Sequence, residues 1–469
     1  MHRGLLIRLL MCLLLPALAL VAAPTTAQAG HREDPRSRNL HPIGHTNDNR
    51  PVTGFDQPFF TDLAFWGNLA IQGTWMGGFR VIDIRRPSRP RVLSEVDCGV
   101  FQGDVGVFGN LVFRSVDTPV KARTAAQTCE NDSFDVLAGP EGGFEGIQIF
   151  RVRDWRRASA ADLVTVVGTD CGSHTHTVVP DLRRGRVLLY VSSSAPSPTY
   201  GRTRFGNQCA ADHNKFQVVE VPLANPKAAR VIRDVPLGPA RGQEVSEDCH
   251  DIGVLINAGR RLAACAGENA VLYDISDPAR PRYLRHFTTA GVTSWHSAAF
   301  SWDGQVTVMG WEPGGGLAPE CEANEPAIKK SIFFFETATG RLLGTWTLPR
   351  AQSAVENCTI HNYSIVPTGR RNVLTAGNYQ AGTWVVDFTN PRRPFTVAWS
   401  DPPPANPNAL TLAGAWGSYW YRGLIFESNI TEGINIFWLL SRLTAGARWM
   451  PFLNPQTQLG PVPVRWRHY

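Results

Sequence analysis

Apolar and polar residues alternate along most of this chain in short runs that end at glycine, asparagine or proline. In residues 62–71 and again in residues 104–113, two apolar runs flank a Gly-Asn pair. Short alternating runs joined by such turn residues are typical of antiparallel β-hairpins. The pattern therefore predicts an all-β protein built from hairpins.

One eight-residue pattern, D-[IF]-x-x-P-x-R-P, occurs three times, and each copy lies between two β-type runs. The copies begin at Asp83, Asp274 and Asp387. Proline cannot donate a hydrogen bond to a sheet ladder, so the pattern marks a turn between two strands. Weaker copies lie at residues 147–152, 216–221, 332–337 and 434–438. The chain therefore contains seven repeats.

The repeat length is that of a propeller blade. The hairpins upstream of the seven copies begin near residues 62, 104, 176, 250, 296, 361 and 416. The shortest spacings, 42 and 46 residues, lie close to the ~40–45 residues of a four-stranded blade. The longer units carry insertions at residues 115–146, 192–215 and 311–331. We expect residues 30–440 to form a seven-bladed β-propeller of four-stranded antiparallel blades.

A family resemblance supports the same architecture. The runs FRVIDIRRPSRPRVL, AVLYDISDPARPRYL and TWVVDFTNPRRPFTV resemble the LVIVD repeat of bacterial exported and cell-surface proteins. The resemblance implies a β-propeller over residues 38–440, with the clearest matches in the first, fourth and sixth units. It implies no particular activity, because that family has no common established one.

The two ends of the predicted ring can also be joined from the sequence. Residues 40–44 resemble residues 92–96, the outer strand of the first unit. We expect the N-terminal segment to add the outer strand of the seventh blade, whose inner three strands lie in residues 416–440. A ring closed in this way leaves no open sheet edge. Residues 441–469 contain four prolines, and we expect an irregular tail there.

The first 29 residues have the layout of a secretory signal peptide. Arg3 and Arg8 precede an apolar run, and an A-x-A cleavage site occupies residues 27–29. No later apolar run approaches the ~20 residues of a membrane span, so we expect a secreted protein, extracellular or at the cell surface. Without the signal peptide the formal charge falls from +6 to +4. No dense basic block remains, which argues against nucleic-acid binding.

Eight cysteines remain after Cys12 is removed with the signal peptide. An even number in an exported chain indicates four disulfides, although 105 pairings are possible. If the insertions and the blade junctions open on one face, the simplest pairing is Cys98–Cys129, Cys171–Cys209, Cys249–Cys265 and Cys321–Cys358. Such bonds either only brace long loops or hold a binding surface in shape.

The first residues of the predicted inner strands form a second series around the mouth of the central channel. They are Asp62, Asp104, His176, His250, His296, His361 and Trp416. Imidazole binds Zn, Cu, Fe or Ni, so the four histidines are candidate ligands of a single transition-metal ion. His174, Asp62 and Asp104 are secondary candidates. The alternative is a structural role, in which each histidine hydrogen bonds to its neighbours.

A four-histidine axial site is similar to that of the carotenoid oxygenases, which are also seven-bladed, although the blade sequences do not resemble theirs. The acidic insertion that carries Glu312, Glu320, Glu322 and Glu325 is expected to be a solvated loop. Motifs of serine hydrolases, zinc proteases and nucleotide-binding folds are absent from the sequence.

Two functional hypotheses follow. The first is an extracellular binding or scaffold module that meets an unidentified ligand or protein through its loop-rich, disulfide-bonded face. The alternative is a metal-dependent extracellular enzyme, oxidoreductase-like, that uses the histidine ring. The sequence assigns no catalytic residue and no oligomeric state.

Overall fold

The computed structural model describes residues 33–46, 59–75, 77–98, 102–120, 125–129, 144–193, 213–257 and 259–460. Within these ranges the chain forms β-strands and short 3-10 turns but no α-helix, which confirms the all-β prediction. The expected signal peptide and much of the first two insertions lie outside the described residues. In the described part of the chain, no helix has the length and apolar character needed to cross a membrane.

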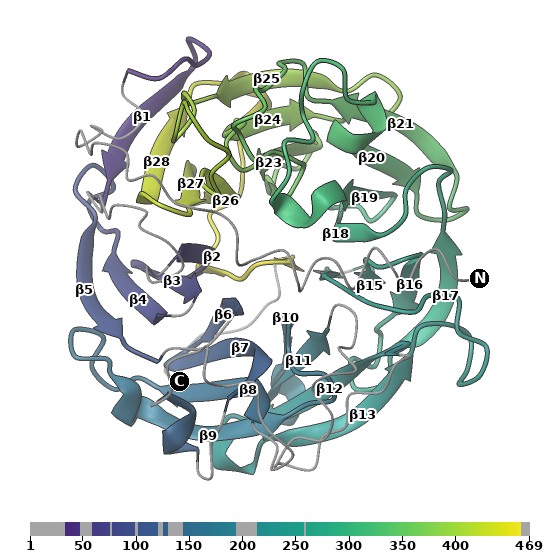
Figure 1. Ribbon diagram of the computed structural model, residues 1–469. Helices are drawn as coiled ribbons and strands as arrows, with labels where there is room; N and C mark the ends of the chain where they lie inside the picture. The colour runs from purple at the N-terminus through teal and green to yellow at the C-terminus, as the bar shows by residue number, and fades with distance from the viewer. Residues whose placement is uncertain are drawn as a thin grey trace.

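Six sheets follow one another in chain order around a ring, as blades do in a β-propeller (Figure 1). The first strand of each unit lies nearest the centre, and the last lies at the rim. The first three sheets contain β2 (Phe59–Trp66), β3 (Leu69–Trp75), β4 (Gly78–Asp83) and β5 (Arg91–Val96); β6 (Gln102–Phe108), β7 (Leu111–Val120), β8 (Phe144–Arg151) and β9 (Leu163–Gly168); and β10 (Thr175–Asp181), β11 (Arg186–Ser192), β12 (Lys215–Pro222) and β13 (Arg230–Pro236).

The next two sheets contain β14 (Ile252–Ile256), β15 (Arg261–Cys265), β16 (Ala270–Asp274) and β17 (Arg282–Phe287); and β18 (Trp295–Phe300), β19 (Val306–Trp311), β20 (Ser331–Glu336) and β21 (Leu342–Thr347). The last sheet has eight strands. It contains β22 (Asn362–Ile365), β23 (Val373–Gly377), β24 (Thr383–Asp387), β25 (Phe395–Ser400), β26 (Ala415–Tyr421), β27 (Leu424–Asn429), β28 (Gly433–Leu439) and β1 (Leu40–His45).

The structure thus has six sheets where seven separate blades were expected. The eight-stranded sheet consists of two four-stranded antiparallel halves, joined where β22 pairs in parallel with β26. Two glycines permit this approach, because a Cβ atom on Gly377 would lie 2.8 Å from the Cα atom of Gly417. The inner strands of the two halves therefore come close enough for two residue pairs of the ladder to form.

The repeated aspartate explains the local turn chemistry. The Oδ1 atoms of Asp83, Asp274 and Asp387 each accept a hydrogen bond from the backbone N–H two residues later, at 3.0, 2.9 and 2.8 Å. This is the Asx-type turn that aspartate favours. The Ile or Phe that follows each aspartate is buried, so it anchors the turn against the sheet.

The hydrophobic core lies between neighbouring sheets. One cluster combines Ile71 and Val81 of the first sheet with Val107 and Phe150 of the second, and all four side chains are inaccessible to solvent. Other clusters join the next neighbours around the ring in the same way. Burial of apolar surface between successive sheets therefore stabilises the ring as one unit.

The N-terminal strand joins the last sheet, as expected from its sequence. β1 pairs antiparallel with β28, from Leu40 opposite Leu439 to His45 opposite Asn435. The preceding residues also contact the other half of this sheet, because Ser37 N–H donates to the Trp399 carbonyl at 2.9 Å. One segment therefore ties the N-terminus to both halves of the eight-stranded sheet.

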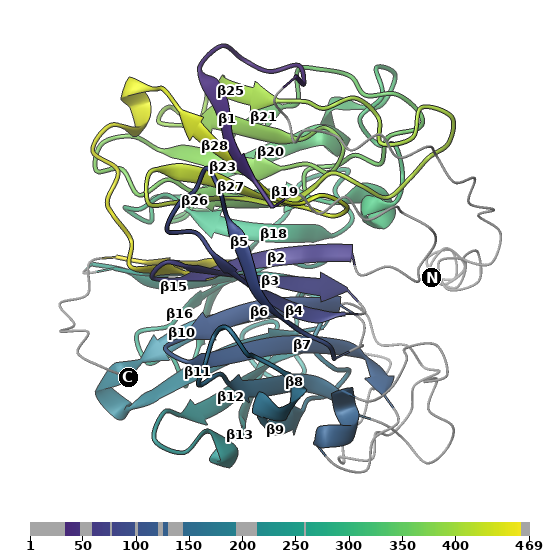
Figure 2. The same cartoon turned by 90° about the vertical axis from the view of Figure 1, so that its left-hand side faces the viewer.

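The tail differs from the expected irregular segment. Residues 452–459 include two short strands, β29 (Phe452–Leu453), which pairs with β2, and β30 (Thr457–Leu459), which pairs in parallel with β14. Three side chains of this segment, Asn454 between the strands and Thr457 and Gln458 in β30, bond to the backbone of other inner strands. In Figure 2 the yellow C-terminal segment descends on the left and turns inward beside β2 and β15. The tail thus crosses the ring at its centre.

Three expected disulfides are confirmed. They are Cys98–Cys129, Cys249–Cys265 and Cys321–Cys358. Cys171 is also disulfide-bonded, and Cys209, its expected partner, lies outside the described residues. Disulfides persist in oxidising compartments, so their presence indicates such a setting for the folded chain.

Candidate metal centre

A row of four imidazoles lies at the inner edges of neighbouring sheets. Ring centroids are 4.3 Å apart for His174 and His250, 4.0 Å for His250 and His296, and 4.5 Å for His296 and His361. Each of the four residues lies on or just before the innermost strand of its unit. Because these strands begin at one end of the ring, the fold brings the four side chains together.

The first imidazole of this row is His174 and not His176, which the sequence analysis favoured. His176 is buried within β10, where its Nδ1 shares a 2.8 Å hydrogen bond with the Ser115 hydroxyl. Burial lowers the pKa of His176 to about 3. His174 precedes the first strand residue, Thr175, so the alternation of side chains along β10 does not determine its direction. His176 therefore has a packing role between sheets.

The second ring nitrogen of the imidazoles fixes their orientation. His250 Nδ1 donates to Asp251 Oδ1 at 3.1 Å, and His361 Nδ1 donates to the backbone carbonyl of Trp416. Each of these two rings therefore keeps its Nε2 lone pair for another partner. Histidine ligands of metal ions typically donate their other ring N–H to a carboxylate or a backbone carbonyl in this way.

His174 is held differently from the other three. Its Nδ1 donates to Asp117 Oδ2 at 2.9 Å, and its Nε2 lies 3.3 Å from the Gln102 amide nitrogen, from which it accepts. Burial acts to lower the pKa of His174, but the hydrogen bond and charge of Asp117 outweigh it, and the pKa is raised. Both ring nitrogens thus have partners, and His174 flanks the cluster rather than offering a free lone pair.

Glu312 brings a carboxylate to the imidazoles. It directly follows β19, and its Oε2 lies 3.5 Å from His296 Nε2 while its Oε1 lies 3.7 Å from His361 Nε2. Tyr379 O–H donates to Oε1 at 2.6 Å. Ligand atoms of His250, His296 and Glu312 all lie within 4.8 Å of one another. Two imidazoles and one carboxylate therefore form a compact donor group at this end of the channel, and His361 adjoins it through Glu312.

The expectation of a solvated acidic loop is wrong for Glu312, whose side chain is only 11% exposed. The acidic composition of the insertion predicted an exposed loop and so did not indicate that Glu312 contacts the imidazoles. The position of Glu312 could have indicated its role. Glu312 immediately follows β19, and because the strands of a hairpin reverse direction, it lies at the end of the ring where the inner strands begin.

Two disulfides support the residues around the site. Cys249 adjoins His250 and bonds to Cys265. Cys358 bonds to Cys321 of the insertion, and backbone hydrogen bonds link Cys358 N–H to the Ala318 carbonyl and Glu320 N–H to the Cys358 carbonyl, both at 3.1 Å. These bonds hold the segment that carries Glu312 against the segment that leads into His361.

Close packing fixes the insertion from its other side. Gly316 has a φ of +71°, and a Cβ atom there would lie 2.3 Å from the Tyr379 hydroxyl. Only glycine fits both the backbone and the space. Tyr379 itself has a φ of +52°, an uncommon conformation for an aromatic residue that the surrounding structure must hold in place. The hydroxyl that holds Glu312 is therefore firmly positioned.

Burial sets the charge state of the cluster. It lowers the pKa of His361 to about 4, lowers that of His296 well below its ordinary value and lowers that of His250 as well. Burial raises the pKa of Glu312 to about 7. The three imidazoles are therefore neutral near pH 7, which is the form that binds metal ions.

Asp62 and Asp104 lie apart from these donors. Both are buried, and Asp62 accepts hydrogen bonds from the Tyr419 hydroxyl and, at 3.4 Å, from the Asn362 amide. Burial raises the pKa of Asp62 to about 7, and burial with the charge of Asp62 raises the pKa of Asp104 well above its ordinary value. In the described part of the chain, the compact group of His250, His296 and Glu312 includes neither aspartate.

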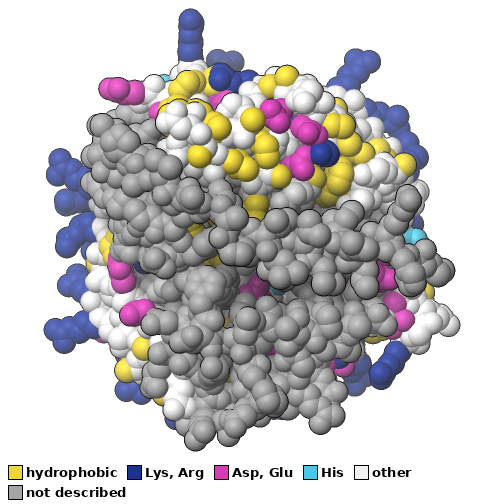
Figure 3. Space-filling view, in the orientation of Figure 1, with side chains coloured by type: hydrophobic (Ala, Val, Ile, Leu, Met, Phe, Trp, Pro, Cys, Tyr) yellow, Lys and Arg dark blue, Asp and Glu magenta, His cyan; other side chains and the backbone are white. Residues whose placement is uncertain are grey.

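Several exposed basic side chains lie on outer strands. Figure 3 shows Lys and Arg side chains projecting around the rim in this view, and Arg91, Arg230 and Arg282 are exposed on outer strands. Salt screens the repulsion between exposed charges over roughly 10 Å. The basic side chains at the rim therefore do not disfavour binding of a cation at the centre.

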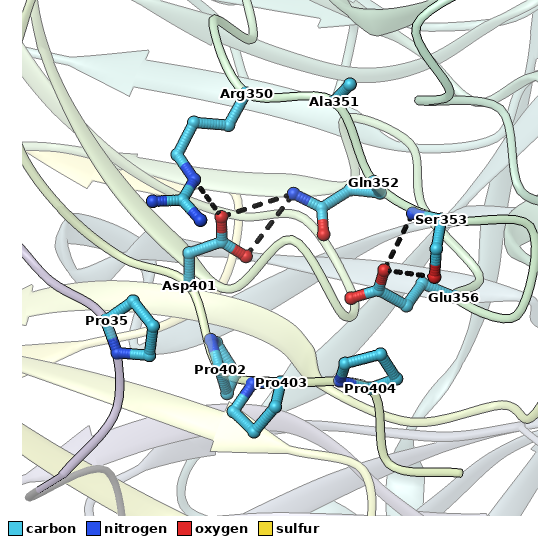
Figure 4. A pocket seen from close by; sticks show the side chains of 10 residues that line it. All are labelled: Pro35, Arg350, Ala351, Gln352, Ser353, Glu356, Asp401, Pro402, Pro403 and Pro404. Atoms are coloured by element: carbon cyan, nitrogen blue, oxygen red, sulfur yellow. Dashed lines mark hydrogen bonds and ion pairs between the residues drawn. The ribbon is translucent and has the colours of Figure 1, made fainter. Parts of the chain in front are cut away.

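A separate hollow of about 410 Å³ lies beside Pro35, Arg350 and a run of three prolines (Figure 4). Its polar groups are already paired, because Arg350 Nε lies 2.6 Å from Asp401 Oδ2 and the Ser353 hydroxyl donates to Glu356 at 2.6 Å. This hollow therefore offers no donor set comparable to the imidazole cluster.

No protein-family model and no curated protein matches the chain. Among solved structures, the computationally designed Ika8 protein is 12% identical, with a TM-score of 0.42, over 85% of this chain and 99% of that one. The β-propeller domain of Myceliophteria thermophila Cps50 (Swd1) is 10% identical, with a TM-score of 0.46, over 83% of this chain and 100% of that one. These likenesses are too distant to indicate a ligand or an activity.

Proposed function

We propose that this chain is an exported metalloprotein that holds one transition-metal ion between His250, His296, His361 and Glu312. We further propose that it acts as a metal-dependent extracellular enzyme, oxidoreductase-like, with the ion at the mouth of the central channel. Neutral imidazoles with one carboxylate suit Zn, Fe, Cu or Ni better than a hard cation such as Ca²⁺.

The observation that carries the proposal is the convergence of these donors with oriented rings. The carboxylate of Glu312 lies 3.5 and 3.7 Å from the Nε2 atoms of His296 and His361. His250 and His361 each donate the other ring N–H to a carboxylate or a carbonyl. A purely structural histidine needs no such convergence of free lone pairs with a buried carboxylate.

An enzymatic role is supported by access to the cluster. The side chains of His174 and His250 are 20% and 16% exposed, so one side of the row meets solvent. Catalytic metal sites typically combine three protein ligands with a position left for water or substrate. The side next to His250 is where we place that position.

We also propose that the two halves of the eight-stranded sheet are two blades, so that the propeller has seven blades. Each half has four antiparallel strands, and the β22–β26 ladder between them has two residue pairs. The shared Asx-type turns at Asp83, Asp274 and Asp387 support membership of the LVIVD-like repeat proteins. The disulfides support export, since they require an oxidising compartment.

The test is metal analysis of the mature protein purified from its export route. We expect close to one transition-metal ion per chain, and loss of most of it in His296→Ala. His286→Ala is the matched control, because His286 is an exposed residue of the outer strand β17. Equal metal content in the parent and both variants, or none in any, would contradict the proposal.

A binding module remains the second candidate, because the disulfide-held insertion also exposes apolar surface. Leu317, four residues before Cys321, is 45% exposed. If the surface serves a protein partner, Leu317→Asp should abolish binding to that partner without changing metal content. The enzyme hypothesis instead expects metal removal, and not Leu317→Asp, to abolish activity.

A further inference from the structure

The C-terminal tail comes within one side chain of the metal-binding cluster. Gln456 lies between β29 and β30, and its amide Nε2 donates to Asp251 Oδ2 at 2.9 Å. The other oxygen of the same carboxylate accepts from His250 Nδ1 at 3.1 Å. Asp251 is only 1% exposed, so the carboxylate that joins these two hydrogen bonds is shielded from bulk water.

We propose that Gln456 is a positioning residue of the metal centre, acting on His250 through Asp251. By holding Oδ2, its amide prevents the carboxylate from rotating and keeps Oδ1 on His250 Nδ1. The imidazole then keeps the tautomer that leaves Nε2 free for the ion. This inference rests on the proposed function and assigns the C-terminal tail a part in metal binding.

The backbone of Gln456 supports this assignment. Its φ is +56°, in the left-handed region that L-residues other than Gly, Asn and Asp seldom adopt. Glycine would occupy the position with less strain. In this conformation the Gln456 carbonyl accepts from Val254 N–H at 2.8 Å while the side chain reaches Asp251. The strain therefore coincides with a side chain that contacts the partner of a candidate ligand.

Two neighbouring tail residues show what a purely structural contact looks like. The Asn454 amide pairs with the backbone N–H and carbonyl of Val107 at 2.6 and 2.9 Å. The Gln458 amide pairs with those of Phe300 at 2.8 and 2.7 Å. Both amides imitate a β-ladder and join the tail to the ring. Gln456, in contrast, bonds to a buried carboxylate that orients an imidazole.

This difference supplies a matched experiment. Gln456→Leu and Gln458→Leu each remove one amide of similar size from the same tail, and both should lower the melting temperature. With Zn²⁺ as the probe and a competing chelator, Gln456→Leu should bind about 10–100-fold more weakly, the usual effect of removing an outer partner of a ligand. Gln458→Leu should bind within about twofold of the parent, since Phe300 ends β18, four residues after His296.

A second variant separates stability from positioning. Gln456→Gly relieves the left-handed backbone, so it should fold as well as Gln458→Leu or better, yet bind Zn²⁺ as weakly as Gln456→Leu. A structural role makes the opposite forecast, because binding would then follow stability across the three variants. Zn²⁺ affinity in Gln456→Gly equal to that of the parent would overturn the inference.

A metal-free measurement keeps this inference distinct from the proposed function. In metal-free protein at pH 8, the ¹⁵N shifts of His250 should show the Nδ1–H tautomer in the parent and in Gln458→Leu, but a mixture in Gln456→Leu. An unchanged tautomer would refute positioning by Gln456 even if the parent binds metal. A parent that binds none of Zn²⁺, Cu²⁺, Ni²⁺ or Fe²⁺ would refute the proposed function, whatever the tautomer.

Discussion

The three histidines of the cluster, His250, His296 and His361, differ mainly in what their Nδ1 atoms contact. His250 and His361 use Nδ1 as a donor to Asp251 and Trp416. The Nδ1 atom of His296 is buried and has no hydrogen-bond partner among the described residues. The ring of His296 packs between those of His250 and His361. We expect its replacement to disturb the cluster most.

The pH dependence of metal binding should come from Glu312. Because burial raises its pKa to about 7, free Glu312 carries a proton below that pH, and an incoming ion must displace it. Affinity for Zn²⁺ should therefore fall by about tenfold per pH unit as the pH is lowered below 7. Chelator competition between pH 5.5 and 8 measures this slope.

Glu312→Gln provides the comparison for this slope. It removes the titrating group, so binding should be weaker at pH 8 but nearly independent of pH in the same range. His361 does not supply the slope there, since burial lowers its pKa to about 4, and burial also lowers the pKa values of His250 and His296. A parent curve as flat as that of Glu312→Gln would show that the carboxylate is not a ligand.

Asp62 should make the folded state less stable as the pH rises. Its pKa is raised by burial from 3.8 to about 7, so between these values the folded chain binds a proton that the unfolded chain does not. The stabilisation is complete below 3.8 and is lost as the pH passes 7. Asp62→Asn cannot ionise, and its amide oxygen can still accept from Tyr419. We expect its melting temperature to exceed that of the parent at pH 8 by about 2–4 °C, with little difference at pH 4.

Asp234 provides a control of opposite sign. Burial acts to raise its pKa, but hydrogen bonds from Gln217 and Lys215 outweigh this, and the pKa is lowered. Asp234→Asn should therefore give no gain at pH 8. Thermal unfolding of Asp62→Asn and Asp234→Asn at pH 4 and pH 8 tests this difference. The same change in melting temperature in both variants would disprove the account of Asp62.

Among the elements, the turns and the insertions have different origins. The repeat turns are local, since an aspartate and the backbone two residues later make them. The insertion after β19 depends on distant parts of the chain, through Cys321–Cys358 and the contact of Gly316 with Tyr379. The site therefore relies on the elements that a repeat pattern describes least well.

Removing the Cys321–Cys358 disulfide should affect both stability and binding. By chain-entropy estimates, the double serine variant loses about 3–4 kcal/mol of stability, and Zn²⁺ affinity should fall because the segment carrying Glu312 is released. The double serine variant of Cys98 and Cys129 is the control, with a similar sequence separation of 31 against 37. Its stability should fall by a similar amount while its affinity stays the same. Equal loss of affinity in both variants would point to a general effect of unfolding.

At the scale of the whole molecule, the ring depends on contacts between segments that lie far apart in the sequence. β1 reaches β28, and the tail reaches inner strands of several sheets. Leu40 is fully buried between Leu439 and the core of the last sheet. Residues 40–45 and 452–459 are therefore structural parts of the ring.

Leu40→Ala should lower the free energy of unfolding by about 2–5 kcal/mol, the usual loss for a buried leucine. The adjacent His41, whose ring lies 5.4 Å from that of the exposed Trp438, points to the other face of the strand. His41→Ala should therefore change stability by less than about 1 kcal/mol. Denaturant unfolding of the two variants compares them directly. Equal effects would mean that β1 contributes no packing to the ring.

Sequence patterns predicted those features that local chemistry determines. The aspartate–proline spelling predicted the strand turns, and the likeness of residues 40–44 to an outer strand predicted the pairing of β1. The pattern could not separate His174 from His176, because that choice depends on where β10 begins.

Other features depend on approaches between distant segments. The joining of two sheets follows from the close approach of Gly377 and Gly417, and the burial of Glu312 follows from a disulfide and a tyrosine far along the chain. The path of the tail depends on side chains that pair with strands hundreds of residues earlier. A local pattern carries no information on such distances.

The pairing of β1 with β28 also sets an order of events during synthesis. Leu40 is made before the other strands of the ring and Leu439 after nearly all of them, so β1 stays without its partner while almost the entire ring is produced. The tail can cross the channel only after that, once residues 452–459 have emerged. Contacts so distant in sequence form slowly, because a long loop must close before they bring any gain. Completion of the ring, and with it of the site that Gln456 supports, therefore follows the synthesis of the strands between β1 and the tail.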